Sequence, residues 1–294
     1  MVYVCLAILF FLFQNIANKE YGNKYDTDVW TLARFHLFTH MAMALSLIAI
    51  GTPVSLPGGA LALSFVYAVA FICAIMMLMR TYTLGPAGKT ALIVNLSMLL
   101  SVLLGVIIWK EQLTTFRILG IPCVLMCLFL STPGKSEGNG NAKWLISVII
   151  TFFLDGSLSI IQKTFITLYP NASTEAFVLD AALFGLGILA VMNIIFLTLR
   201  KTRTLRRQHR RSATKRVYLF LLLAVVVGAS TAIATMFNMK ALEALAGVIV
   251  FPVRQGGLIV LMTVYGIVRY KDKLDLKGVF MMLFGLAGIM LLNF

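Results

Sequence analysis

The chain has 294 residues, of which 60% are hydrophobic and only 12% are charged, and its mean hydropathy is +0.95. Soluble domains carry roughly 45–50% apolar residues, so this composition excludes an ordinary soluble protein and predicts an integral membrane protein. The net charge of +14 would indicate a nucleic-acid partner in a soluble chain. Nine of the 25 basic residues lie between Arg200 and Arg216, without interleaved aromatic residues and between long apolar segments, so we expect no nucleic-acid partner.

Ten apolar segments follow one another along the chain, bounded by charged residues, Pro, Gly or Asn. A helix needs about 20 apolar residues to cross a bilayer. We therefore predict an all-α polytopic membrane protein with ten transmembrane helices, located in the cell membrane, whose first helix is not a cleaved signal peptide. The predicted helices cover approximately 2–18, 29–50, 58–80, 86–109, 115–130, 144–167, 174–199, 217–239, 243–268 and 276–293.

One connection divides the ten predicted helices into two groups of five. It is “STPGKSEGNGN”, Ser131 to Asn141, whose Gly, Ser, Asn and Pro content is typical of a flexible linker. We therefore predict three parts, a first five-helix unit over 1–130, the linker over 131–141, and a second five-helix unit over 142–294.

The two units contain similar short motifs at equivalent positions. The motif “WKEQLT” ends the fourth predicted helix and “YKDKLD” ends the ninth, so Glu111 and Asp272 are counterparts. A weaker pair is “QNIANKEY”, which begins at Gln14, and “QKTFITLY”, which begins at Gln162. Repeats with five helices each must be inverted, because an odd number of crossings turns the second copy upside down. We expect the two units to superpose after a rotation of about 180° about an axis in the membrane plane, an arrangement found in secondary transporters.

The same residues carry a family resemblance. The stretch from “LGPAGKTALIVNLSMLLSVLLGVIIWKEQLTTFRILG” in the first unit to “LAGVIVFPVRQGGLIVLMTVYGIVRYKDKLD” in the second resembles the EamA-type branch of the drug/metabolite transporter superfamily. In that family the fourth helix of each repeat ends in a short acidic turn. Arg34 resembles an arginine often found early in the family's second helix. The resemblance implies a ten-helix fold of two inverted repeats and a transport function.

Loop charges predict the orientation in the membrane. The odd-numbered loops contain 19 Lys and Arg residues, whereas the even-numbered loops, which share a face with both termini, contain four. Basic loops remain in the cytoplasm, so the charge pattern places both termini outside. The family resemblance implies cytoplasmic termini instead, and we prefer the orientation given by the charges of this chain.

Arg254 is the strongest candidate for a functional residue. An ionisable group at the bilayer centre costs about 2.5–3.5 kcal/mol on insertion scales, and Arg254 lies near the middle of the ninth helix in “FPVRQGG”. Pro252 removes a backbone donor there, and Gln255 adds an amide to the cluster. Two interpretations remain open, a substrate contact or a structural ion pair with Asp155 or Asp180.

Weaker candidates lie elsewhere in the helices. Asn95 and Ser97 occupy the matching depth of the fourth helix, and Arg34 together with Arg254 could attract an anionic or zwitterionic solute. His36 and His40 have HxxxH spacing without a third ligand, so we interpret them as packed neutral histidines and expect no metal. Glu111 and Asp272, at helix ends, are interpreted as parts of connecting turns, the alternative being substrate ligands.

The favoured function is secondary transport of a small polar or amphipathic solute, such as a metabolite or drug, by alternating access at a midplane site. The expected partners are this solute, the lipid bilayer and a coupling proton or ion, and the chain acts as a monomer or homodimer. Without a GxxxxGK[ST] motif we expect no ATP site, no cofactor and no enzymatic activity. The alternatives are a membrane-embedded enzyme acting on lipid, or a channel or scaffold without a transport cycle.

Overall fold

The computed structural model describes residues 1–25, 28–53, 56–84, 90, 93–94, 97–111, 114–130, 142–200, 213–270 and 276–292. Every regular element in these ranges is an α-helix, and a helix lies in each of the ten predicted segments, with α5 in the fourth. The helices are α1 (Val2–Lys24), α2 (Val29–Ala49), α3 (Gly58–Leu84), α5 (Met98–Ile107), α6 (Thr115–Leu130), α7 (Ala142–Leu168), α8 (Thr174–Arg200), α9 (Ala213–Ala244), α10 (Gly247–Tyr270) and α11 (Leu276–Leu292). The predicted linker and Asp272 lie outside the described residues.

The helices have the length and composition of membrane spans. In the described ranges, six of them, α1, α2, α3, α7, α8 and α9, are long and apolar enough to cross a membrane. Large apolar side chains on their outer faces are exposed, among them Ile146, Phe153 and Ile194. Helices satisfy their own backbone hydrogen bonds, and exposed apolar side chains suit lipid, so this is a multi-pass integral membrane protein.

The first helix is longer than its sequence predicts. It was expected to end near residue 18 because charges follow, but α1 continues to Lys24. Glu20 and Lys24 form an ion pair of 2.8 Å along the helix, and the fully buried Tyr21 stacks on Phe35 of α2 with ring centroids 3.8 Å apart. Tertiary packing of Tyr21 and local charge pairing therefore extend the helix beyond its apolar part.

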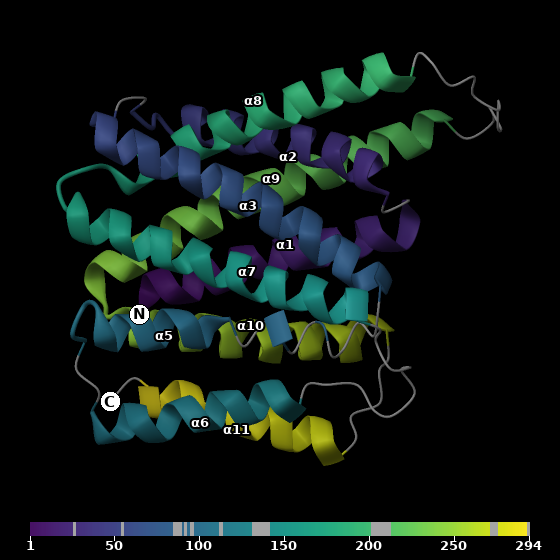
Figure 1. Ribbon diagram of the computed structural model, residues 1–294. Coiled ribbons are helices and arrows are strands. Elements are labelled where there is room, and N and C mark those ends of the chain that lie inside the picture. The colour runs from purple at the N-terminus through teal and green to yellow at the C-terminus, as the bar shows by residue number, and fades with distance from the viewer. Residues whose placement is uncertain are drawn as a thin grey trace.

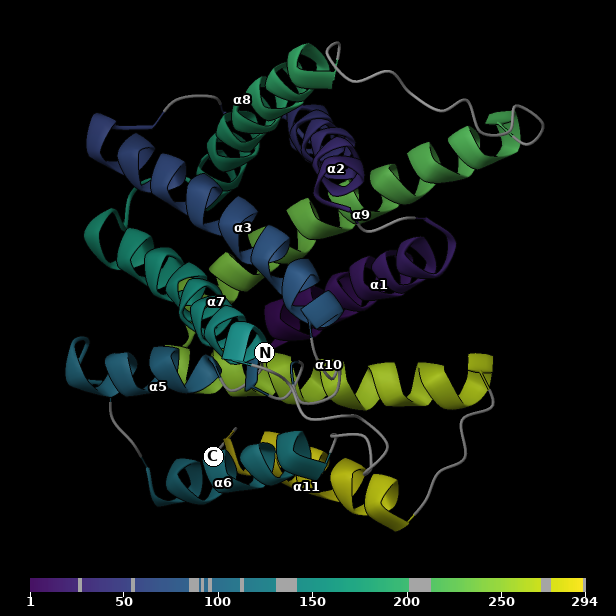
Figure 2. The same ribbon diagram turned by 45° about the vertical axis from the view of Figure 1, so that its right-hand side comes forward.

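Both chain ends lie at the same end of the helix bundle (Figure 1). Helix α5 finishes at this end, whereas α10 starts there and finishes at the opposite end. Figure 2 shows α6 and α11 side by side, separated from the other helices by α5 and α10, and α6 contacts α11 extensively. The end of the bundle that holds the termini is called the terminal end below.

The helix contacts have the same pattern in both halves. Helix α1 packs against α9 and α10, while α7 packs against α3 and α5. Helix α2 packs on α9 and α8 on α3, and the pairs α2 with α8, α5 with α10 and α6 with α11 are also in contact. Exchanging each helix of the first half for its counterpart in the second therefore reproduces these pairs.

Small residues allow the helices around the centre to approach closely. A Cβ atom placed on Gly228 of α9 would collide with the Thr39 carbonyl oxygen of α2, and one on Gly257 of α10 would lie 2.8 Å from Ile8 Cδ1 of α1. Such contacts are typical of helix packing in membranes. Helix α9 contains the small and hydroxylated stretch “GASTAIATMF”, and its Thr235 lines the central cavity described next.

Candidate functional site

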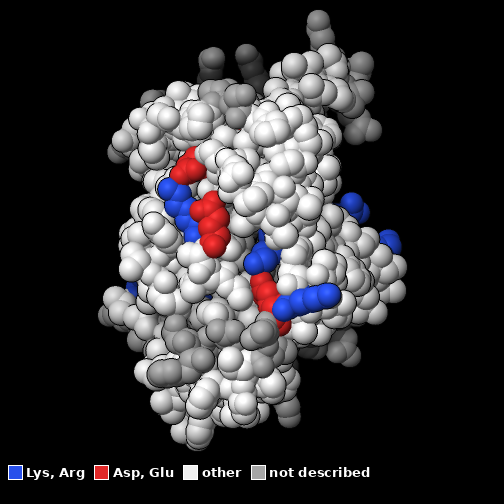
Figure 3. All heavy atoms as spheres, turned by 90° about the vertical axis from the view of Figure 1, so that its left-hand side faces the viewer, with Lys and Arg blue, Asp and Glu red and all other residues white. Residues whose placement is uncertain are grey.

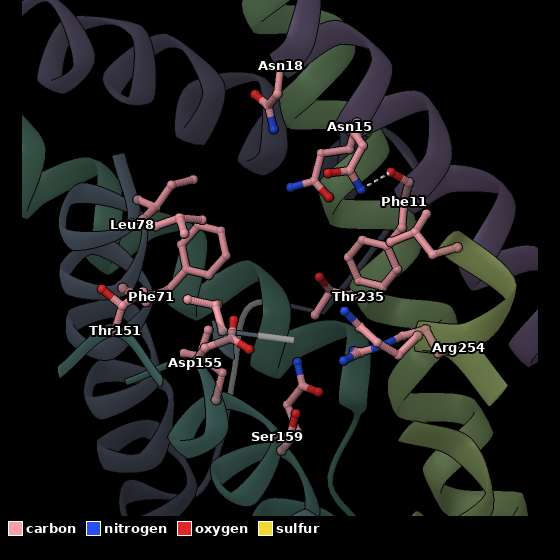
Figure 4. A pocket seen from close by; sticks show the side chains of 18 of the residues that line it. Phe11, Asn15, Asn18, Phe71, Leu78, Thr151, Asp155, Ser159, Thr235 and Arg254 are labelled. Atoms are coloured by element: carbon pink, nitrogen blue, oxygen red, sulfur yellow. Dashed lines mark hydrogen bonds between the residues drawn. The ribbon is translucent and has the colours of Figure 1, made fainter. Parts of the chain in front are cut away.

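A cavity of about 240 Å³ lies between α1, α3, α7, α9 and α10, so both halves of the chain contribute to its wall (Figure 4). Its polar wall includes four amides and four hydroxyl groups, from Gln14, Asn15, Asn18, Gln162, Tyr67, Thr151, Ser159 and Thr235. Its apolar wall includes Phe11, Phe71, Leu78, Leu158 and Leu258. Two ionisable side chains that are opposite in charge, Asp155 and Arg254, complete it.

Arg254 reaches the cavity from α10, two residues after Pro252. Its Nη1 atom donates a hydrogen bond of 3.3 Å to Asn238 Oδ1 of α9. The guanidinium lies over two rings, with its Cζ atom 5.3 Å from the Phe11 centroid and 5.8 Å from the Phe251 centroid. Amide and ring contacts hold the cation in place through partners that carry no charge.

A chain of hydrogen bonds continues from Arg254 across three more helices. Asn238 Nδ2 donates to Gln162 Oε1 at 2.8 Å, and Gln162 Nε2 donates to the Tyr67 hydroxyl at 2.9 Å. These three side chains are almost fully buried. The chain joins α10, α9, α7 and α3, so it fixes the positions of polar groups at the cavity wall.

Asp155 lies across the cavity from Arg254, and the two side chains point toward one another in Figure 4. The Asp155 Oδ2 atom accepts a hydrogen bond of 2.5 Å from the Ser97 hydroxyl. Among the described residues, no ion pair of 4.0 Å or less joins Arg254 to any carboxylate. The two charged side chains therefore line one cavity without forming a direct ion pair.

The other predicted site residues are distributed differently. Gln255 lines the cavity beside Arg254, while Asn95 lies outside the described residues. Arg34 does not line the cavity, because its guanidinium lies over the Phe196 ring of α8 at 5.5 Å. Asp180 is also absent from the wall, although it is buried and its Oδ2 atom has no hydrogen-bond partner among the residues that the structure describes.

The two histidines of α2 are packed in the protein interior. His36 and His40 are both almost fully buried, and His40 Nδ1 lies 2.8 Å from the His36 carbonyl oxygen. The His40 ring fills the space that a side chain on Gly185 of α8 would occupy. In the described part of the chain no three potential ligands cluster as a metal site would require.

Sequence reasoning missed most of the neutral wall. Tyr67, Asn18 and Asn15 were not singled out, because single amides and hydroxyl groups occur equally in helix packing. One signal was available, since Gln14 and Gln162 begin the two similar motifs of the halves and both line the cavity. The sequence analysis used this similarity only as evidence for a repeat, although it also marks two positions in the cavity wall that residue type alone did not reveal.

Glu111 lies away from the cavity, at the terminal end. Lys110 adopts a φ of 50°, and the following Glu111 N–H donates to the Gly105 carbonyl oxygen at 3.1 Å. The Glu111 carboxylate accepts hydrogen bonds of 2.9 Å from the N–H groups of Gly247 and Val248, which begin α10. It also pairs with Lys163 of α7 at 2.7 Å. One side chain thus caps α10 and joins it to α5 and α7.

Figure 3 shows that charged side chains at this end gather in small groups on a mostly uncharged surface. Besides the Glu111 pair, the structure has an ion pair of 2.5 Å between Lys240 near the end of α9 and Glu175 at the start of α8. The terminal end is therefore held by charged contacts between helices, whereas the helix walls face lipid with apolar residues.

The Glu111 contacts predict a specific pH dependence of stability. Burial alone would raise the pKa of Glu111, but the Lys163 ammonium and the Gly247 and Val248 N–H groups hold the pKa below its ordinary value of 4.5. A lowered pKa means that the stabilisation is present above pH 4.5 and is lost as the pH falls through the lowered value. We expect the gap in thermal midpoint between wild type and Glu111→Gln to be largest at pH 7 and to shrink in acid. The other carboxyl groups titrate in both proteins, so their effect cancels in this difference. A difference in thermal midpoint of equal size at every pH would contradict the stabilising role of the ionised Glu111 carboxylate.

The fold and the cavity define a polytopic helical membrane protein with a charged and polar site between two sets of helices. Residues 1–132, from the N-terminus through α6, match the EamA-like transporter family. This match agrees with the resemblance to the EamA-type branch of the drug/metabolite transporter superfamily that the motifs predict.

Comparison with solved structures concerns the fold. One crystal structure superposes on this chain with a TM-score of 0.75 at 14% sequence identity, covering 99% of this chain and 94% of that chain. At this identity the likeness extends to the arrangement of helices and no further. A comparison with curated protein sequences gives no match.

Proposed function

We propose that this protein is a secondary transporter of a small polar or amphipathic solute, which binds in the central cavity and crosses the membrane by alternating access. The observation that carries the proposal is the cavity itself, where Arg254 and Asp155 face one another in the middle of a lipid-exposed bundle. Unpaired ionisable groups at that depth are costly and mark solute or ion pathways. The volume of about 240 Å³ lies below the roughly 300–1,000 Å³ of sites for drug-sized ligands, which favours a small solute.

The moving parts in this proposal are two inverted five-helix units, 1–130 and 142–294, joined by the linker 131–141. The shared contact pattern of the halves supports this division, as do the ends of α5 and α10 at opposite ends of the bundle. The matched family range also stops close to the end of the first unit. An experimental structure in which those two helix ends lay on one membrane face would contradict the inverted arrangement.

The proposed binding residues are Arg254, Gln255 and Asp155, with Ser97 positioning Asp155 through its hydrogen bond. Asn95 remains a candidate from the sequence. Arg34 and Asp180 are left out of this proposed site because neither lines the cavity. Rocking between the units would expose these residues alternately to the two sides of the membrane.

The terminal end is the proposed closed side in this conformation. The wall of the cavity extends from Arg254 toward Asn18 and Leu78, near the far ends of α1 and α3. In the other direction, Glu111 joins α5, α7 and α10 across the two units. Opening toward the terminal end requires these contacts to separate, which makes them part of the proposed transport cycle.

Transport is tested with purified protein in sealed proteoliposomes. Amino acids, sugars, organic anions, nucleotides and cationic drugs are first screened for thermal stabilisation, and each stabilising compound is then offered as a radiolabelled solute. Saturable uptake above that of empty liposomes is the expected result. Uptake without saturation would favour a channel. Chemical conversion of the liposome lipids or of the solute by the protein would favour a membrane enzyme.

The orientation gives a second test of the proposed cell-membrane topology. Nineteen basic residues in the odd-numbered loops predict that a reporter inserted after Lys201 is cytoplasmic and that one at the C-terminus is outside. Accessibility to an impermeant labelling reagent on intact cells and after permeabilisation measures both. Labelling of the Lys201 reporter on intact cells would show that the loop charges do not determine the orientation of this chain.

A further inference from the structure

We infer that one water molecule binds in a small cavity beside the central one, where it joins the Tyr67 and Thr235 hydroxyl groups to the ring of His40. This water site is separate from the proposed solute site, and neither the transport function nor the solute enters the inference. Its basis is the size and the uncharged wall of the small cavity, together with the direction in which the surrounding side chains donate their hydrogen bonds.

The small cavity has a volume of about 10 Å³ and is lined by residues of α2, α3, α8 and α9. A water molecule needs a cavity of roughly 10–15 Å³ and two to four polar partners. The wall offers four candidate partners, which are His40, Tyr67, Thr231 and Thr235. No described lining residue is an acid, a lysine or an arginine. The cavity therefore has room for one water molecule, and its wall suits a neutral occupant.

His40 has an acceptor that needs a donor. Its Nδ1 atom lies 2.8 Å from the His36 carbonyl oxygen, which can only accept, so Nδ1 carries the ring proton. A second proton would leave a buried imidazolium in an uncharged wall, so the ring is neutral and Nε2 carries a lone pair. A Cβ atom on Gly185 would lie 2.7 Å from Nε2, so the glycine keeps this edge of the ring uncovered. The lone pair is therefore open to a donor from the small cavity.

Tyr67 and Thr235 supply the donor, and both line the central cavity as well as the small one. The Tyr67 oxygen accepts a hydrogen bond of 2.9 Å from Gln162 Nε2, so the Tyr67 proton is directed to another partner. Tyr67 also hydrogen-bonds to Thr235. Each of these hydroxyl groups has a single proton, so whichever of them donates to the other, one O–H group remains for an acceptor in the small cavity.

Thr231 offers a second acceptor. Its hydroxyl group donates to the Val227 carbonyl oxygen at 2.7 Å, so its lone pairs remain for the cavity. The wall thus presents one donor and two acceptors. A water molecule matches this set, because it can donate to His40 and Thr231 while it accepts from Tyr67 or Thr235. A metal cation or an ammonium group could not accept that O–H group.

The water molecule extends the chain of hydrogen bonds that begins at Arg254. From the guanidinium through Asn238 and Gln162 to Tyr67, every bond is donated in the same direction. The water continues this direction to the lone pair of His40, and hydrogen bonds that point head to tail polarise one another. His40 is therefore a positioning residue for the Tyr67 hydroxyl group at the central cavity, and α2 joins the helices that hold this wall.

The test observes His40 directly by ¹⁵N NMR of the purified full chain with labelled imidazole rings. The chain has three histidines, so each signal is assigned by replacing one histidine at a time with glutamine. At neutral pH we expect the His40 ring to carry its proton on Nδ1, with the Nε2 resonance displaced upfield as for a nitrogen that accepts a hydrogen bond. We also expect a nuclear Overhauser contact between the carbon-bound protons of this ring and a water molecule.

Two variants and a matched control examine the partners of the water. Thr231→Val removes one acceptor at nearly constant shape and should weaken the water contact of His40. Ala181→Val fills part of the cavity with methyl groups, so it should abolish the contact and move the Nε2 resonance toward that of a free lone pair. The control is Thr164→Val, which removes a hydroxyl group that donates to the Ile160 carbonyl oxygen at 2.8 Å and lines neither cavity. The His40 signals should not change in this control.

A protonated Nε2 in wild type, or a His40 ring without a water contact in folded wild-type protein, would overturn the water site. Equal changes of the His40 signals in the Thr164 and Thr231 variants would also contradict it, because a general loosening of the bundle would then explain them. The wild-type spectrum needs no variant, so an Ala181→Val protein that does not fold leaves the test decisive. Uptake is not part of the measurement, so its failure leaves the transport proposal standing.

Discussion

Replacing Arg254 by glutamine should reduce solute uptake by at least about 30-fold, because removing one partner of a buried charged contact costs roughly 2–5 kcal/mol. Arg254→Lys keeps the charge but loses the planar fork that binds a carboxylate through two parallel hydrogen bonds. A direct solute contact should therefore suffer under both changes. A simple counter-charge for Asp155 should tolerate lysine.

Arg34→Gln is the matched control for this experiment. Arg34 is also a helical arginine, but its guanidinium lies over Phe196 rather than in the cavity. We expect its uptake to stay within about twofold of wild type, since an exposed or partly exposed cation–π contact contributes only about 0.5–1 kcal/mol. Equal losses of uptake in the Arg34 and Arg254 variants would argue against a specific site at Arg254.

Uptake and thermal stability are measured together for each Arg254 variant. Loss of uptake with normal stability supports a binding role. Loss of both, with recovery when Asp155→Asn is added, would assign Arg254 to structure, because removing both charges would then relieve an uncompensated buried carboxylate.

Glu111→Ala should destabilise the protein by about 3–5 kcal/mol, which is the usual cost of breaking a buried ion pair by removing one partner. The Glu111 side chain is 7% exposed and that of Lys163 is 13% exposed, so water cannot replace the lost contact easily. The same change removes the acceptor for the first two N–H groups of α10. At a fixed scan rate the thermal midpoint should fall by about 6 °C or more.

Glu20→Gln provides the comparison on the same scale. Glu20 pairs with Lys24 along α1, and their side chains are 21% and 47% exposed. Such helical ion pairs contribute about 0.3–0.5 kcal/mol, so its midpoint should change little. A Glu111→Ala midpoint indistinguishable from that of Glu20→Gln would mean that the contacts of Glu111 do not stabilise the bundle.

The structure describes one of the two similar motifs that end the fourth and ninth predicted helices. The sequence interpretation of “WKEQLT” as a connecting turn agrees with a Glu111 that stays out of the cavity. Its contacts go beyond a connection, since the carboxylate binds the start of a helix 136 residues further along the chain. The corresponding “YKDKLD” residues Lys271 to Asp275 lie outside the described residues.

The sequence by itself determined the membrane class, the succession of helices and the strongest site candidate. Long apolar segments must form helices in lipid, because no water is present to satisfy their backbone groups. A charge within such a segment is expensive wherever it occurs, which is why Arg254 was identifiable without a structure. These inferences depend only on local composition, which can be read directly from the amino-acid sequence.

Only the tertiary structure decided which polar residues meet. Arg34 and Arg254 are both arginines within helices, yet one lies against Phe196 and the other lines the cavity beside Asn238. Tyr67 and Gln162 are 95 residues apart in the chain and hydrogen-bond directly. A neutral amide or hydroxyl group costs little on any helix face, so its role is set by the rotation and neighbours of the helix, which arise from packing over the whole bundle.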